Sequence, residues 1–147
     1  MKTSLAATGS WPGHPPRTIK ACLRIRLPLR SNLPVRAIVD TGAQATVGNV
    51  ALQLALRKRL KRDAMGPDRI QGATGEWQEG VGTRSTQIRL GDLTVRDAHV
   101  TFADLRIFEN WEMNDEPALL IGMDLIGLVD QLVIDYRRRE LHIKPRD

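Results

Sequence analysis

The sequence has few aromatic residues, a single cysteine and no long apolar run. Aromatic residues make up 4% of the 147 residues, so aliphatic side chains must supply most of the core of a single domain. The lone Cys22 excludes an intrachain disulfide and gives no evidence for an oxidising compartment. No apolar run approaches the roughly 18 residues that a membrane-spanning helix needs, so we expect no membrane span.

Several kinds of functional site are also missing from the sequence. The three histidines, at positions 14, 99 and 142, lack the spacing of a zinc site, so we expect no zinc site. We also expect no other metal and no cofactor. There is no Gly-x-Ser-x-Gly element, and Cys22 has no predicted histidine partner, which leaves serine and cysteine hydrolysis without support. No Gly-Lys-Ser/Thr follows the glycine-rich segment 70–77, so this segment is not a nucleotide loop.

The net charge of +5 raises the question of a nucleic-acid partner. The basic residues are concentrated in three short runs at 57–59, 61–62 and 137–139. Such runs are usually solvated faces or turn tips, and few aromatic side chains are interleaved with them for stacking on bases. We therefore expect no nucleic-acid partner.

Residues 1–17 contain three prolines and two glycines without hydrophobic periodicity. This composition predicts a disordered N-terminal extension, with the ordered domain over 18–147. The head has no apolar segment long enough for a signal peptide, which indicates a cytoplasmic location for the chain as written. A start further upstream would leave a periplasmic or membrane-tethered location open.

The rest of the sequence predicts many short strands and few helices. Alternating apolar and polar residues predict a strand over 19–27, and a second strand ends at Asp40. Asn49 is a suitable N-cap for one substantial helix over 50–62, which Gly66-Pro67 would end. A β-meander is expected from Ile70 onward, with turns at glycines 72, 75, 80, 82 and 91 and a hairpin between 86–90 and 93–102.

The C-terminal third predicts an acidic, irregular insert, a short helix and a last hairpin. The insert covers 105–117, the helix 125–129, and the hairpin 132–143, with Asp135 as a surface or turn carboxylate. Phe108 and Trp111 are three residues apart, and they either plug the insert locally or line a substrate pocket or a subunit contact. Together the elements predict an all-β fold, a small closed barrel with one substantial and one short helix.

Asp40, at the end of an apolar strand, is the most informative residue. The run Ala37-Ile38-Val39 delivers it onto the turn Thr41-Gly42-Ala43. A carboxylate in such a place is costly unless it is hydrogen-bonded or has a chemical role. The turn supplies a hydroxyl donor and a residue without a Cβ, so that another backbone can come close. A second element, Leu119-Leu120-Ile121-Gly122-Met123-Asp124, follows later in the chain.

These two elements resemble those of the retropepsin-like aspartic proteases, over about Thr18 to Lys144. The resemblance implies an acid-protease-type barrel with Asp40 as the catalytic residue, and with Thr41, Gly42 and Ala43 supporting it. It also implies that Gly122 and Asp124 form a structural motif beneath that turn. Retroviral members usually have arginine before the second aspartate. This chain has Met123 there, and in this it is similar to some cellular and bacterial members.

The implied chemistry is hydrolysis of a polypeptide by water, activated by two carboxylates that share one proton. Asp40 is the only aspartate in an Asp-Thr/Ser-Gly context, so we expect a homodimer that pairs two Asp40 residues. A tandem domain is the other possible source of the second aspartate. Asp124 is not expected to be that second acid, because an aspartate before a short helix is a standard N-cap.

The segment from Ile70 to Trp77 resembles the flap of this family, a glycine-tipped hairpin that closes over the substrate. The expected flap and substrate-binding residues are Gly72, Ala73, Thr74, Gly75 and Trp77. An ordinary glycine-rich hairpin is the alternative interpretation of this segment. The alternative to a protease is a catalytically inactive module of the same fold that binds peptides or dimerises.

Overall fold

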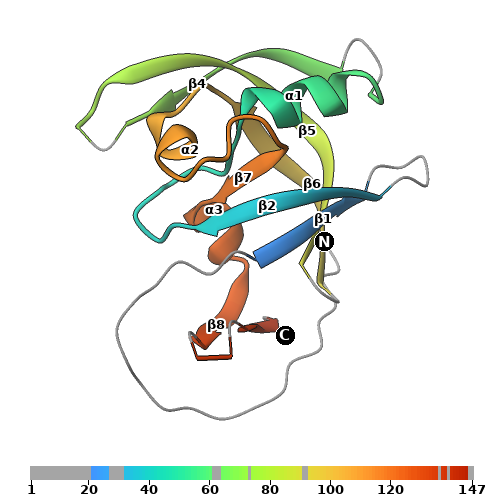
Figure 1. Ribbon diagram of the computed structural model, residues 1–147, viewed down its shortest axis with the longest axis vertical. Helices are drawn as coiled ribbons and strands as arrows, with labels where there is room; N and C mark the ends of the chain where they lie inside the picture. The colour runs from blue at the N-terminus through green and yellow to red at the C-terminus, as the bar shows by residue number, and fades with distance from the viewer. Residues whose placement is uncertain are drawn as a thin grey trace.

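The computed structural model describes residues 21–26, 32–60, 64–72, 74–90, 93–135, 137–138 and 140–145. The described residues form the strands β1 (Ala21–Arg26), β2 (Asn32–Val39), β3 (Val47–Gly48), β4 (Met65–Gln71), β5 (Trp77–Leu90), β6 (Leu93–Phe102), β7 (Ala118–Ile121), β8 (Val129–Asp135) and β9 (Glu140–Pro145). The helices are α1 (Val50–Arg57), α2 (Arg106–Asn110) and α3 (Met123–Ile126). The fold is thus mostly β with a few helices, as expected (Figure 1). The predicted disordered extension at 1–17 lies outside the described residues.

One seven-stranded sheet forms the body, in the order β1-β2-β7-β3-β6-β5-β4, and β8 and β9 form a separate hairpin. The expected closed barrel is not formed. Strand β4 pairs with residues 77–83 of β5, and β1 pairs with residues 87–89 of the same strand. Within the described residues, β5 is the only strand that pairs with β4, so the sheet remains open at β4.

The two motif strands are buried on both faces, which explains their continuous apolar runs. Successive residues of a strand point to opposite faces, so Ala37 and Ile38 of β2 enter two different hydrophobic clusters. In β7, Leu119 and Leu120 are divided in the same way. The first cluster contains Leu52 and Leu56 of α1, and the second contains Ile38, Val47, Ile70, Ala103, Phe108, Met113, Ala118 and Leu120.

The N-terminus of α1 is capped as predicted. The Asn49 side chain accepts a hydrogen bond from the Leu52 N–H at 2.8 Å, and its amide donates to the backbone oxygens of Met113 and Glu116. The Asn49 side chain also accepts from the Ala118 N–H at 3.0 Å. This one side chain therefore ties α1 to the segment that leads into β7.

The end of α1 and several turns differ from the predictions. The helix ends at Arg57 and not at residue 62, and Gly66-Pro67 lies inside β4. Gly80 and Gly82 are in β5 and not in turns. A Cβ on Gly80 would lie 2.6 Å from the Phe102 oxygen, and one on Gly82 would lie 2.4 Å from Asp68 Oδ2. The absence of a Cβ at these two glycines therefore allows the neighbouring strands to approach closely.

Both predicted hairpins of the second half are confirmed, whereas the short helix expected at 125–129 lies at Met123–Ile126, and Val129 already belongs to β8. Leu90 pairs with Leu93, so β5 and β6 form the expected hairpin around residues 91–92, which are outside the described ranges. Strands β8 and β9 form the last hairpin, and Asp135 Oδ1 accepts from the Arg138 N–H, as a turn carboxylate would. The part of the chain that the structure describes contains no helix long and apolar enough to cross a membrane.

The insert at 105–117 contains a helix, α2, that the sequence did not predict. Phe108 is fully buried in the second cluster, whereas Trp111 is 37% exposed. Their different burial shows that Phe108 is a core residue that anchors the insert.

Candidate functional site

The two motif elements lie side by side because their strands are parallel neighbours. Val39 of β2 is in register with Ile121 of β7, and the Asp40 N–H donates to the Ile121 oxygen at 3.0 Å. Neighbouring parallel strands end at the same edge of a sheet. The loop after Asp40 and the turn at Gly122 therefore begin next to each other, at the same edge of the sheet.

Asp40 is held through one carboxylate oxygen. The Gly42 N–H donates to Asp40 Oδ1 at 2.8 Å, and the Ala43 N–H donates to the Asp40 backbone oxygen at 3.3 Å. Among the described residues, Oδ2 has no hydrogen-bond partner. Asp40 is partly buried, while Thr41 and Gly42 are exposed. The turn thus orients the carboxylate and leaves its second oxygen open.

The turn at Gly122 packs directly against the loop after Asp40. The Met123 N–H donates to the Ala43 oxygen at 2.8 Å. A Cβ on Gly122 would lie only 2.5 Å from the Ala45 oxygen, a distance that real side chains do not tolerate. Glycine is therefore required at position 122 by close backbone approach.

Asp124 binds the same loop through Thr46. Thr46 donates from its backbone N–H to Asp124 Oδ2 at 3.0 Å and from its hydroxyl to Oδ1 at 2.6 Å. The Thr46 hydroxyl also accepts from the Gly122 N–H at 3.1 Å. The prediction that Asp124 is an N-cap is wrong, because Gly122 caps α3 and Asp124 lies in its first turn.

Thr46 is a site residue that the sequence reasoning missed. It is fully buried and has contacts with both motif elements. The signal was a threonine inside the apolar run Ala45-Thr46-Val47, since a buried hydroxyl needs partners.

The predicted flap segment forms the tip of the β4–β5 hairpin. The Gly72 N–H donates to the Glu76 oxygen at 2.8 Å, and the Gly75 N–H donates to the Gly72 oxygen at 3.0 Å. Gly75 has a φ of 91°, a conformation that favours glycine. The Thr74 hydroxyl donates to the Glu76 carboxylate and lowers the pKa of Glu76. Ala73 lies outside the described residues.

Trp77 is the first residue of β5, and its side chain is largely exposed. It is 56% exposed, and the Arg69 guanidinium lies 4.5 Å from the centroid of its ring. The hairpin is also anchored below its tip, because Ile70 is buried in the second cluster and the Gln78 amide donates to the Asp104 oxygen. In Figure 1 the hairpin tip and the loop after β2 lie on the same side of the molecule, with α2 between them.

A polar cluster joins β4 to β6 below the hairpin tip. Asp68 Oδ2 accepts from the Thr101 hydroxyl at 2.7 Å and lies 2.7 Å from His99 Nε2. Burial alone would raise the pKa of Asp68, but hydrogen bonds from Thr101, from the Arg69 N–H and from His99 outweigh it and lower that pKa.

The comparisons with known proteins agree with this arrangement. A family model described as aspartyl protease matches residues 28–125, well over half of the chain, including both motif elements and the β4–β5 hairpin. No curated protein matches the chain. In the described ranges, no group of three or more His, Cys, Asp or Glu residues could hold a metal ion. The chain therefore belongs to the aspartyl protease family, as the resemblance of its motifs to the retropepsin-like proteases predicted.

Proposed function

We propose that this protein is an aspartic endopeptidase in which Asp40 residues from two copies of the chain form the catalytic pair. The observation that carries the proposal is the position of Asp40 and the hydrogen bonding of its carboxylate. Asp40 stands at the end of a strand that is buried on both faces. The Gly42 N–H binds one carboxylate oxygen, and the other oxygen has no hydrogen-bond partner among the described residues. A general base must be oriented in this way and must keep an oxygen free for water.

The second carboxylate comes from a second copy of the chain, because Asp124, the aspartate of the other motif element, already serves as a hydrogen-bond acceptor within the fold. Both of its oxygens accept hydrogen bonds from Thr46. The sequence contains one Asp-Thr-Gly element, so a two-fold axis is the simplest way to bring two such turns together. The exposed Thr41 would hydrogen-bond across that axis, and Gly42 would allow the close approach.

The substrate would be an extended polypeptide between the β4–β5 hairpin and the Asp40 turns. An extended peptide can add backbone hydrogen bonds in the manner of a strand. The hairpin tip, with Gly72, Ala73, Thr74 and Gly75, would close over it as a flap and exclude water. The exposed Trp77 would add an apolar surface beside the peptide.

In this mechanism the pair of carboxylates holds one proton. The ionised member takes a proton from water, and the protonated member polarises the scissile carbonyl. Two adjacent carboxylates cannot both ionise without strong repulsion, so activity should be highest at mildly acidic pH and should fall when both lose their protons.

The test is cleavage of an unfolded protein between about pH 4 and about pH 7, a range that compares mildly acidic with neutral conditions. The variants are Asp40→Asn and, as a matched control, Asp97→Asn, which makes the same change at an exposed position in β6. Acid-favoured cleavage that is lost only in Asp40→Asn supports the proposal. Cleavage by Asp40→Asn, or flat activity across this range, would contradict it. No cleavage by a folded, dimeric wild type would favour the peptide-binding module.

A further inference from the structure

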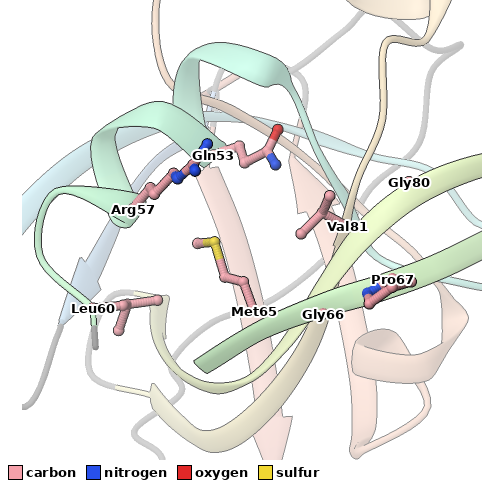
Figure 2. A pocket seen from close by; sticks show the side chains of 8 residues that line it. All are labelled: Gln53, Arg57, Leu60, Met65, Gly66, Pro67, Gly80 and Val81. Carbon is pink, nitrogen blue, oxygen red and sulfur yellow. The ribbon is translucent and has the colours of Figure 1, made fainter. Parts of the chain in front are cut away.

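A pocket separate from the Asp40 turn lies between α1 and the strands β4 and β5. Its volume is about 590 Å³, within the range of about 300–1,000 Å³ that small-molecule sites occupy. Figure 2 shows its lining side chains, which are Gln53, Arg57 and Leu60 on one side and Met65, Pro67 and Val81 on the other. None of them belongs to either motif element.

The pocket is apolar along its strand wall and polar at α1. In Figure 2, the Met65 side chain points from β4 toward α1, and the Arg57 and Gln53 side chains extend from the helix. Gly66 and Gly80 complete the strand wall, which carries no charged side chain. A ligand here would therefore meet an apolar surface and one polar end.

The polar end carries the positive charge of Arg57. Within the described residues, no carboxylate forms an ion pair with Arg57, whose side chain is exposed. A guanidinium binds a carboxylate through two parallel hydrogen bonds, and the Gln53 amide can add a donor. Arg57 is the one charged side chain among the lining residues, and one guanidinium matches one carboxylate.

We propose that this pocket binds an aliphatic monocarboxylate, with the carboxylate at Arg57 and Gln53 and the hydrocarbon chain against Leu60, Met65 and Val81. Residues 1–20 of the chain itself do not fit this site, because they contain no acidic side chain to meet Arg57. Peptide binding at this pocket is an outcome that the test below distinguishes. The inference is independent of catalysis, since binding is measured without any peptide substrate.

The test is calorimetric titration of the full chain with octanoate, and with octylamine and octanol for comparison. Arg57→Gln removes the charge, and Lys58→Gln makes the same charge change on the adjacent residue, which does not line the pocket. Octanoate should bind at one site per chain, about tenfold or more weakly to Arg57→Gln and with unchanged affinity to Lys58→Gln, because one charge-assisted contact is lost. Octylamine should not bind, and octanol should bind more weakly than octanoate.

A second variant tests the apolar wall. Val81→Phe adds bulk from the strand side and should reduce octanoate binding, with folding checked by circular dichroism. If this variant does not fold, the exposed Arg57→Gln variant still decides the question. The proposal is overturned if folded wild type does not bind octanoate, or if Arg57→Gln and Lys58→Gln bind it equally. Tighter binding of a leucine-terminated peptide than of octanoate would also overturn it.

Discussion

Replacing Thr46 by valine tests how much of the site depends on one hydroxyl. This hydroxyl donates to Asp124 Oδ1 at 2.6 Å and accepts from the Gly122 N–H at 3.1 Å. Valine keeps the shape of the side chain, but it leaves the buried Gly122 N–H without an acceptor and removes a donor to the carboxylate. Each loss is worth about 1–3 kcal/mol. Because Asp124 is exposed and water can replace part of its lost bond, we expect about 2–4 kcal/mol in all.

The assay is urea unfolding followed by circular dichroism, with Thr46→Ser as the matched control. Serine keeps the hydroxyl and removes one methyl group, so it should lower the free energy of unfolding by only about 1 kcal/mol. If Thr46→Val is no less stable than Thr46→Ser, the hydroxyl does not hold the two elements together and the reasoning fails. If the reasoning holds, cleavage activity should fall further in the valine variant than in the serine variant.

Three further predictions concern other parts of the fold. Gly122→Ala places a Cβ 2.5 Å from the Ala45 oxygen and should lower the free energy of unfolding by about 3 kcal/mol or more. The control is Gly66→Ala, whose Cβ meets nothing within 4 Å and which should change this free energy by less than about 1 kcal/mol. Equal effects of the two variants would contradict this account. Phe108→Ala removes a fully buried ring and should cost about 3–5 kcal/mol in the same urea assay, and a loss below about 1 kcal/mol would show that the insert is not anchored there. Burial alone would raise the pKa of Asp68, but its hydrogen bonds outweigh burial and hold this pKa below its ordinary value. The ionised Asp68 therefore stabilises the fold above about pH 4, and this contribution is lost as the pH falls further. The difference in unfolding free energy between wild type and Asp68→Asn should therefore be larger at about pH 6 than at about pH 3, and a constant difference would refute it.

Sequence reasoning succeeded where local chemistry decides the structure. Asn49 could be identified as an N-cap because its amide oxygen serves an N–H only three residues away. The hairpin at Leu90 and Leu93 could be predicted because the turn lies between two strands that are adjacent in sequence. The Asp40 turn was recognisable because its geometry depends on Gly42 and the apolar strand before it.

It failed where partners distant in sequence decide. Gly80 and Gly82 have the appearance of turn residues, but their role depends on Phe102 and Asp68, which approach from neighbouring strands. The function of Thr46 depends on Asp124, to which the chain returns only after five more strands. The pocket at Arg57 could not be predicted, because three separate elements form it.

The central claim is that two copies of Asp40 act together, and mixing tests it most directly. Wild type is refolded with an equal amount of Asp40→Asn, so that subunits exchange at random, and cleavage is measured against the same amount of wild type refolded with Asp97→Asn. Only dimers with two intact aspartates can act in the first mixture, which leaves about a quarter of the dimers active, whereas all dimers in the control stay active. Activity near a quarter of the control is the predicted result. Activity near half would mean that each Asp40 works without a second copy, and it would contradict the account.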